Sequence, residues 1–492
     1  MRDRNSDREE VMVVGAGTMG AGIAFVAAQN GHRVVLVDAL PAGLERGRML
    51  VAEMAGAAEK RGLLDSAERT SLEARIRYAG TPIGADAATI IIEAIVEDAD
   101  AKADLVRTVS AQMGPRTIFA SNTSSLSVNA LAHHCADSAR FAGLHFFNPV
   151  PAMKLVEIIP APTTSPATVE MLVRLVEAWR KVPVVARDVP GFIVNNVARP
   201  YYGEAFAALG EGIEPETIDA LMTGAGGFRM GPLALADLIG HDINYAVARS
   251  IHSERQGLAR FRPSPEQAEL VENGLLGRKS GRGLYDYVSP RPVAAEAERQ
   301  HPLETVQAAA DCGALEPLLD RLREAGCLVA RVDELPSGYL SINSLRLAIG
   351  DGRTLAERED VDVLLDIVRD WITANAIGVT VRTPAGYAVA AMLGARLGVT
   401  VHTVPDRPGQ IVLRSLAQLA NAAADALAED VASIAHIDAA MRLGANHPEG
   451  PCDWTMRHGV DTVEQALVHI ARGSDDAIYA PSAGFALLRD VA

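Results

Sequence analysis

Cysteine, basic residues and long apolar runs are all scarce in this sequence of 492 residues. The four cysteines are scattered, with no CxxC pair and no histidine at zinc-ligand spacing, so we interpret them as reduced thiols and expect no metal site. No stretch reaches the roughly 18 uninterrupted apolar residues of a membrane-spanning helix. The first ten residues are polar and lack the apolar stretch of a signal peptide. Together these features predict a cytoplasmic protein.

Acidic residues outnumber basic ones by 62 to 46, which gives a formal net charge of −16. Nucleic acids and anionic membranes are bound through basic surfaces. We therefore expect no nucleic-acid partner and no membrane partner. A polyanionic ligand would have to bind to a local cluster of basic residues.

The N-terminal apolar segments follow the pattern of a buried parallel sheet. Residues 11–14 form a short apolar run, a helical stretch follows at 20–30, and residues 34–37 form the next apolar run. Strands that are apolar throughout are typical of parallel sheets covered by helices on both faces. We expect two Ala-rich helical segments between residues 40 and 78. Further strands are predicted at residues 89–93, 117–121, 141–145, 154–159 and 182–186.

A GxGxxG motif lies between the first predicted strand and the first helix. Its glycines permit a tight turn, close approach of a pyrophosphate and close helix–strand packing, and the helix N-terminus attracts the phosphates. Asp38 ends the next strand, where a carboxylate accepts from the ribose 2′-hydroxyl and repels a 2′-phosphate. An ordinary glycine turn is the alternative, but the motif's context favours NAD as the cofactor. The predicted NAD-binding residues of this region are Gly15, Ala16, Gly17, Thr18, Met19, Gly20 and Asp38.

Beyond residue 190 the sequence changes to long helical stretches and then repeats itself. Residues 188–194 recur at 406–412, 218 residues later, and residues 218–222 recur at 437–441, 219 residues later. Ordered matches at a near-constant offset indicate a duplicated helical domain. The expected organisation is an NAD-binding domain at 1–190 with a helical insertion at about 40–78, a first helical domain at 191–288, a linker or degenerate α/β segment at 289–404, and a second, non-catalytic helical domain at 405–492.

Residues 121–126, 141–149 and 153–157 closely resemble the 3-hydroxyacyl-CoA dehydrogenase family, and residues 190–195 and 277–281 extend the match. The tandem C-terminal part resembles the two-copy 3-hydroxyadipyl-CoA and 3-hydroxybutyryl-CoA dehydrogenases of phenylacetate degradation. The resemblance implies a Rossmann-type α/β domain followed by tandem all-α domains of the 6-phosphogluconate dehydrogenase type. It also implies an NAD-dependent oxidoreductase of β-oxidation and fatty acid metabolism, acting on L-3-hydroxyacyl-CoA.

His145 and Glu157 are the candidates for the catalytic proton transfer. Oxidation of a secondary alcohol needs a base for the hydroxyl proton, and histidine, with an ordinary pKa of about 6.5, suits that role. A carboxylate such as Glu157 could orient the imidazole and stabilise the imidazolium. The two residues end separate predicted strands, so only tertiary packing can bring them together. A buried core histidine is the alternative, and the flanking family motif favours catalysis.

The resemblance assigns roles to further residues. It implies that Ser124 contacts substrate and nicotinamide, and that Asn195 holds the substrate carbonyl or the His–Glu pair. Arg61 would contact coenzyme A, whereas Met54 departs from a polar contact that some relatives have. The positions that would contact NAD are Glu97, Lys102, Asn148 and Lys279. For Glu97 and Lys102 the alternative is a solvated helix start, and for Lys279 it is a basic residue in a surface turn.

Arg229 stands where simpler 3-hydroxybutyryl-CoA dehydrogenases usually carry proline. Its guanidinium could bind the terminal carboxylate of a dicarboxylic acyl chain, or it could pair with a nearby acid such as Asp237. Several functions therefore stay open: oxidation of 3-hydroxyadipyl-CoA, oxidation of 3-hydroxybutyryl-CoA, oxidation of a free hydroxy acid, and non-enzymatic binding of NAD or acyl-CoA. The second copy lacks the chemistry, because Leu413 replaces Asn195 and no second GxGxxG motif precedes it. Short members of the family that the sequence resembles dimerise through this helical domain, so we expect a homodimer, or a monomer whose two helical domains form an internal pseudo-dimer.

Overall fold

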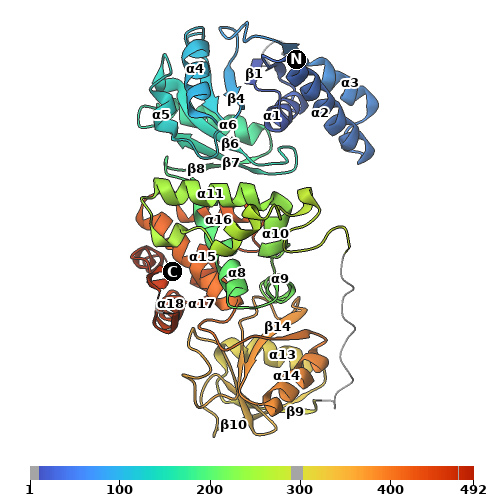
Figure 1. The fold of residues 1–492 in the computed structure, drawn as a ribbon, viewed down its shortest axis with the longest axis vertical. Coiled ribbons are helices and arrows are strands. Elements are labelled where there is room, and N and C mark those ends of the chain that lie inside the picture. Colours follow the sequence, from blue (N-terminus) through green and yellow to red (C-terminus); the bar gives the residue numbers. More distant parts are fainter. Residues whose placement is uncertain (1–9, 290–302, 475, 492) are drawn as a thin grey trace, which may run out of the picture. The chain divides into compact units, whose positions relative to one another are not determined.

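The computed structural model describes residues 10–289, 303–474 and 476–491 (Figure 1). The polar N-terminal residues 1–9 and residues 290–302 of the expected linker or α/β segment lie outside the described residues. The chain forms two compact units. The first unit consists of Met1–Asn196 and Asp430–Ala445, and the second consists of Val197–Glu429 and Asn446–Ala492. Residues 430–445 thus fold with the first unit, although the sequence repeat assigns them to the second helical domain.

The first unit contains an eight-stranded sheet in the order β3-β2-β1-β4-β5-β6-β7-β8. Neighbouring strands are parallel except β6 and β7, which are antiparallel. The strand order reverses beside β1, and in such sheets ligands bind outside the carboxyl ends of the strands at that point. The strands are β1 (Glu10–Val14), β2 (Arg33–Val37), β3 (Ile76–Ala79), β4 (Ile90–Glu93), β5 (Ile118–Ser121), β6 (Phe141–Phe146), β7 (Leu155–Pro160) and β8 (Val182–Val185).

Every strand predicted from an apolar run is confirmed, whereas β3 was not predicted. It is a four-residue strand at the sheet edge, and its second residue, Arg77, is exposed, so its sequence lacks a continuous apolar run. The predicted pair of helices is also present, as α2 (Pro41–Lys60) and α3 (Ser66–Ala74). Asp65 and Glu68 form a capping box that begins α3, because each side chain accepts from the other residue's backbone N–H.

The other helices of the first unit cover the sheet or follow it. Helix α1 is buried along most of its length, from Gly20 to Ala28, as a crossover between central strands must be. Among the described residues, no helix combines the length and apolar character needed to cross a bilayer. The remaining helices of this unit are α4 (Ala99–Ser110), α5 (Val128–Ala132), α6 (Pro166–Ala178), α7 (Val194–Val197) and α16 (Ile434–Gly444), and α1 spans Thr18–Gln29.

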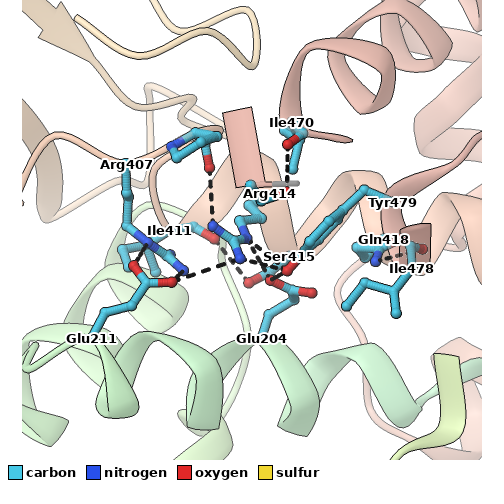
Figure 2. Close-up of polar contacts among 12 residues, drawn as sticks. Glu204, Glu211, Arg407, Ile411, Arg414, Ser415, Gln418, Ile470, Ile478 and Tyr479 are labelled. Atoms are coloured by element: carbon cyan, nitrogen blue, oxygen red, sulfur yellow. Dashed lines mark hydrogen bonds and ion pairs between the residues drawn. The ribbon is translucent and has the colours of Figure 1, made fainter. Parts of the chain in front are cut away.

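The second unit joins both helical copies around α15, which is buried on nearly every side. Helix α8 of the first copy packs against α15, and ion pairs connect the copies, among them Arg407 with Glu211 and Arg414 with Glu204 (Figure 2). The helices are α8 (Arg199–Gly210), α9 (Pro215–Gly224), α10 (Pro232–Ile239), α11 (His241–Glu254), α12 (Pro265–Glu272), α15 (Val412–Ala428), α17 (Pro451–His458), α18 (Val460–Ser474) and α19 (Phe485–Arg489).

Residues 303–404, where the sequence indicated only a linker or a degenerate α/β segment, contain a second sheet of seven strands. Its order is β10-β9-β11-β12-β13-β14-β15, with parallel and antiparallel pairs mixed. The elements are β9 (Thr305–Ala309), α13 (Glu316–Glu324), β10 (Leu328–Val332), β11 (Tyr339–Ile342), β12 (Leu345–Ile349), β13 (Val363–Leu365), β14 (Ala376–Val381), α14 (Pro384–Leu397) and β15 (Thr400–Thr403). Exposed or half-buried residues interrupt several of these strands, as in β10 and β15, which explains why the sequence pattern was diffuse.

Candidate active site

The GxGxxG turn joins β1 to α1, and each glycine has a separate steric reason. Gly15 has a φ of 107°, and a Cβ there would lie 2.4 Å from the carbonyl oxygen of Ala94. A Cβ on Gly20 would lie 1.8 Å from the Gly15 carbonyl oxygen. Gly17 is exposed, with nothing within 4 Å of an added Cβ, and α1 begins there without a side-chain cap. The open helix N-terminus therefore fits the pyrophosphate of a dinucleotide.

Asp38, which directly follows β2, stabilises this turn through hydrogen bonds. Its Oδ2 accepts from the backbone N–H of Ala16 at 2.9 Å, and its Oδ1 accepts from that of Leu40 at 3.0 Å. Gly43 of α2 approaches the same carboxylate, since an added Cβ would lie 2.5 Å from Asp38 Cγ. The carboxylate remains partly exposed beside the open turn, where its bond to a ribose hydroxyl stays a prediction.

His145 and Glu157 meet across the antiparallel pair β6 and β7, whose register places them directly opposite each other. His145 Nδ1 lies 2.7 Å from Glu157 Oε2, and both side chains are buried. Glu157 Oε1 accepts from the backbone N–H groups of Ile193 and Val194, each at 3.0 Å. The carboxylate thus binds one imidazole nitrogen and leaves Nε2 as the nitrogen that can exchange a proton with a substrate.

Two phenylalanines flank the imidazole. The ring centroid of Phe147 lies 4.5 Å from that of His145, and the centroid of Phe192 lies 5.8 Å away in an edge-on arrangement. Phe192 has a φ of 47°, a conformation that is strained for a bulky side chain. The strained turn directs the following N–H groups of Ile193 and Val194 toward Glu157.

A buried charge network lies between β4, α4 and the turn that carries Ser124. Lys102 is 1% exposed and its Nζ contacts Glu93 Oε1 at 2.6 Å and Glu97 Oε2 at 3.1 Å. Glu97 Oε1 accepts from the Ser124 backbone N–H at 2.7 Å. Burial would raise the pKa of Glu97, but the charge of Lys102 and hydrogen bonds from Thr123 and Ser124 lower it to about 2. Lys102 is therefore not part of a solvated helix start, because it is enclosed between carboxylates.

The remaining candidates of the first unit are more exposed. Asn195 is half-buried on α7, and the hydrogen bonds that hold Glu157 come from the backbone of the two preceding residues, Ile193 and Val194, rather than from the Asn195 side chain. Asn148 is exposed after β6, and Arg61 is exposed at the C-terminal end of α2. Arg61 has no acidic partner within ion-pair distance in residues 10–289, 303–474 and 476–491, so its guanidinium is available to a phosphate. Met54 packs against the core.

Arg229 and Lys279 lie in the second unit. Asp237 is buried and accepts from His241 and from the backbone N–H groups of Leu284 and Tyr285, so the alternative that it pairs with Arg229 is wrong. Arg229 itself is exposed. Lys279 lies in a 3₁₀ turn, Arg278–Ser280, and forms an ion pair with Asp242, as expected of a basic residue in a surface turn.

Glu93 and Phe147 were not among the predicted site residues. Glu93 ends a strand that is otherwise apolar and is completely buried, where it also accepts from Ser121 Oγ at 2.5 Å. A charged residue at the carboxyl end of a central strand is a signal that could have identified it. Phe147 carries no chemical group that would distinguish it in a sequence.

The second sheet contains a counterpart of the His–Glu pair without the histidine. The residue that pairs with Leu144 on β7 pairs in turn with Val185 on β8, and the residue that pairs with Leu365 on β14 pairs in turn with Thr403 on β15. Thr403 lies 218 residues after Val185, which is the offset of the repeat. Leu144 and Leu365 therefore occupy equivalent positions. Asp366 therefore corresponds to His145, and Gly378 corresponds to Glu157. Asp366 is fully buried, and its carboxylate accepts from the N–H groups of residues Ile411, Val412 and Leu413 at 2.7–3.0 Å. The backbone donors are retained and the titratable imidazole is absent.

Comparison with known proteins agrees with this geometry. A family model described as 3-hydroxyacyl-CoA dehydrogenase, NAD binding domain, matches residues 10–189. A second, described as 3-hydroxyacyl-CoA dehydrogenase, C-terminal domain, matches residues 191–287 and again 409–488. The chain is 38% identical over 482 residues to the 3-hydroxyadipyl-CoA dehydrogenase of Escherichia coli (strain K12), covering 96% of each chain.

Shorter relatives match the first part alone. A probable 3-hydroxybutyryl-CoA dehydrogenase of Deinococcus radiodurans is 41% identical over 278 residues, which cover 56% of this chain and 99% of that protein. Among solved structures, the crystal structure of a 3-hydroxybutyryl-CoA dehydrogenase from Escherichia coli K12 superposes with a TM-score of 0.87 at 35% identity. It covers 99% of this chain and 98% of that one. The similarity to full-length relatives therefore includes the second sheet and both helical copies.

Proposed function

The chain belongs to the 3-hydroxyacyl-CoA dehydrogenase family, and on that premise we propose that His145 and Glu157 perform the proton transfer of its NAD-dependent oxidation. The observation that carries the proposal is the buried contact of 2.7 Å between His145 Nδ1 and Glu157 Oε2. The two backbone N–H groups fix the position of this carboxylate, and its negative charge stabilises a positive charge on the neighbouring ring.

When bound, NAD supplies the acceptor for the hydrogen that leaves the substrate carbon with its electron pair. The glycine turn at Gly15–Gly17–Gly20 holds the pyrophosphate through the open N-terminus of α1. His145 Nε2 takes the proton of the substrate hydroxyl and returns it in the reverse reaction. Ser124 and Asn195 hold the substrate oxygen, while the network of Lys102 and Glu97 sets the position of the Ser124 backbone.

Coenzyme A carries several phosphate charges, and the α2–α3 pair supplies an exposed cation for them. Some basic residues of this pair are already engaged: Arg69 pairs with Glu59 and Glu73, and Arg48 stacks over Tyr78. Arg61 is exposed without an acidic partner among the described residues. Arg46 and Lys60 of α2 are exposed as well, so exposure alone does not single out Arg61. We assign the coenzyme A contact to Arg61 because the family resemblance implies a basic contact at that position.

Arg229 is the basis on which we assign the type of acyl chain that the substrate carries. Its side chain is exposed and Asp237 is occupied by other donors, which supports a role in binding an external carboxylate. The full-length relative from Escherichia coli (strain K12) is named for 3-hydroxyadipyl-CoA, whose acyl chain ends in a carboxylate. We therefore propose a 3-hydroxy dicarboxylic acyl-CoA as the preferred substrate.

The activity is tested by following the absorbance of NADH at 340 nm with acetoacetyl-CoA and, separately, with acetoacetate. Oxidation of NADH with the thioester alone is the expected result, because the free acid lacks the coenzyme A phosphates that the helical pair binds. Equal rates with both substrates would remove the acyl-CoA assignment. No rate with either would contradict the proposed activity.

The acyl-chain assignment is tested with Arg229→Gln, which removes the charge and keeps the turn. The ratio of kcat/KM for 3-hydroxyadipyl-CoA to that for 3-hydroxybutyryl-CoA should fall about tenfold or more, as expected when a charged hydrogen bond of about 1.5–3 kcal/mol is lost. The rate with the butyryl substrate should stay within about twofold. An unchanged ratio would exclude Arg229 from substrate selection.

A further inference from the structure

Helix α16 comes from the C-terminal repeat but packs on the sheet of the first unit, against β7 and β8. The backbone N–H of Arg187 donates to the carbonyl oxygen of Val431 at 2.8 Å, just before this helix. His436, in its first turn, lies with Nδ1 3.3 Å from both the backbone nitrogen and the carbonyl oxygen of Val185. The segment is thus joined to the end of β8 by hydrogen bonds as well as by packing.

The C-terminal end of α16 approaches the candidate active site through a glycine. A Cβ on Gly444 would lie 2.5 Å from Leu155 Cδ2, 2.9 Å from Val194 Cγ2 and 3.6 Å from Phe147 Cζ. The first two distances are shorter than real Cβ atoms tolerate, so only glycine allows the helix to pack this closely. Gly444 does not have a positive φ, and its requirement is therefore one of space and not of backbone conformation.

Each of the three neighbours supports the His–Glu pair. Leu155 lies two residues before Glu157 on β7. The backbone N–H of Val194 donates to Glu157 Oε1, and the Phe147 ring packs against the imidazole of His145. A displacement of these side chains would therefore change the position of both members of the pair.

The other half of the molecule contains the same arrangement without a catalytic pair. Helix α9 packs on β14, and a Cβ on Gly224 would lie 2.3 Å from Asn375 Oδ1 and 2.6 Å from Ala376 Cβ. Ala376 is the equivalent of Leu155, since their strand partners, Thr400 and Val182, are 218 residues apart. Each helical copy thus gives its second helix to the sheet of the other copy, and only the sheet that α16 reaches carries the His145–Glu157 pair.

We propose that Gly444 is a positioning residue of the active site, through which the C-terminal repeat holds Val194 and Phe147 against the Glu157–His145 pair. The C-terminal repeat then contributes to catalysis and does not serve only to cover apolar surface. This inference rests on the proposed function of that pair. It identifies a requirement of the reaction that lies in a part of the chain with no cofactor motif.

The test compares Gly444→Ala with Gly224→Ala, the same substitution at the last residue of α9, the helix that packs on the second sheet. Both variants introduce a methyl group into a crowded contact, so both should lower the thermal unfolding temperature. With acetoacetyl-CoA and NADH, Gly444→Ala should lower kcat at least tenfold, leave the KM for NADH within twofold and shift the pH dependence of kcat. Gly224→Ala should retain kcat and the pH profile of the unmodified protein.

A second pair, Met441→Ala and Met222→Ala, tests the same contrast by removing volume from buried, equivalent positions of α16 and α9. It replaces the first pair if Gly444→Ala does not fold. Equal kcat and equal pH profiles within either folded pair would overturn the inference. Failure of the proposed function itself is recognised separately, because His145→Gln would then retain its activity while either pair could still differ.

Discussion

At the residue scale, the chemistry depends on whether each buried polar group has enough hydrogen-bond and ion-pair partners. Glu157 is fully buried and uses Oε1 for two backbone N–H groups and Oε2 for His145. Lys102 is likewise enclosed and is matched by Glu93 and Glu97. In both places the charged group has its partners on neighbouring elements, so a single substitution leaves a buried group unpaired.

His145→Gln and Glu157→Gln test the proton transfer. Glutamine at 145 cannot exchange the proton, and glutamine at 157 leaves an imidazolium without its carboxylate. We expect kcat to fall about 10²–10⁴-fold in both variants, in line with general acid–base contributions. NADH binding, measured by fluorescence titration, should be unchanged because the glycine turn is intact. Rates within a few-fold of the unmodified protein would contradict the mechanism.

Lys102→Met tests the buried network. It leaves the carboxylate of Glu93 buried without its cation, which should lower the free energy of unfolding by about 3–5 kcal/mol in urea denaturation. Lys60→Met, at an exposed position of α2, is the control and should change this free energy by less than about 0.5 kcal/mol. A loss as small as that of the control would mean that water or backbone groups satisfy Glu93.

The same substitution changes the dependence of stability on pH. The pKa of Glu97 in the folded protein, about 2, lies below its usual value of 4.5. Its ionised form therefore stabilises the fold above about pH 4.5, and this contribution is lost as the pH falls toward 2. Without Lys102 the pKa of Glu97 rises, and the midpoint of acid unfolding, followed by circular dichroism, should move to higher pH. An unchanged midpoint would show that the lysine is not the source of the shift.

At the scale of elements, both halves use a buried carboxylate to hold the start of a helix. Glu157 accepts from the residues that begin α7, and Asp366 accepts from those that begin α15. Free N–H groups and the positive end of the helix dipole both favour a carboxylate at such a position. In the second half a buried carboxylate holds the start of a helix although no histidine is paired with it. Holding the helix and transferring a proton are therefore separate roles.

Asp366→Asn should destabilise the second unit strongly. In the unmodified protein the backbone N–H groups donate to two carboxylate oxygens, whereas the asparagine amide offers them only one acceptor oxygen. We expect a loss of about 3 kcal/mol or more, measured by chemical denaturation, with each charged hydrogen bond contributing about 1.5–3 kcal/mol. Asp406→Asn is the matched control: its exposed carboxylate also accepts two backbone N–H groups, and its loss should be below about 1 kcal/mol. Similar losses in the two variants would contradict the anchoring role.

At the scale of the whole molecule, the two copies of the helical region are inseparable from each other. Helix α15 is buried on nearly every side, and Arg414 on it pairs with Glu204 of α8 with only 5% of each side chain exposed (Figure 2). Glu204 and Tyr479 together raise the pKa of Arg414, although burial opposes this, so the guanidinium remains charged. Removing one copy would expose both an apolar helix face and an unpaired carboxylate.

Deletion of residues 405–492 should therefore cause self-association or aggregation, because it uncovers the apolar surface that α15 buries. It should also reduce activity, because the deletion removes Gly444 from the first unit. Light scattering coupled to size-exclusion chromatography measures the first effect, and the acetoacetyl-CoA assay measures the second. A truncated protein of monomeric mass with full activity would contradict both expectations.

The local chemistry was predictable from sequence. The GxGxxG turn, the apolar strands of the first sheet and the capping of α3 depend on residues close together in the chain, and short-range sterics and hydrogen bonds determine them. The family motifs also identified His145, Glu157 and Ser124 as candidates, and the structure brings His145 and Glu157 into contact. Duplication of the helical region was visible as a constant offset.

Only the tertiary structure decided which distant segments share a surface. Nothing near Gly444 in the sequence indicates that it lies against Leu155 and Val194, because that contact spans more than half of the chain. The buried partners of Lys102 and the second sheet were equally hidden, since short mixed strands carry little periodicity of their own. Local patterns determine how a segment folds, whereas complementary shape and charge between segments determine where it packs, and the candidate site of this protein depends on both.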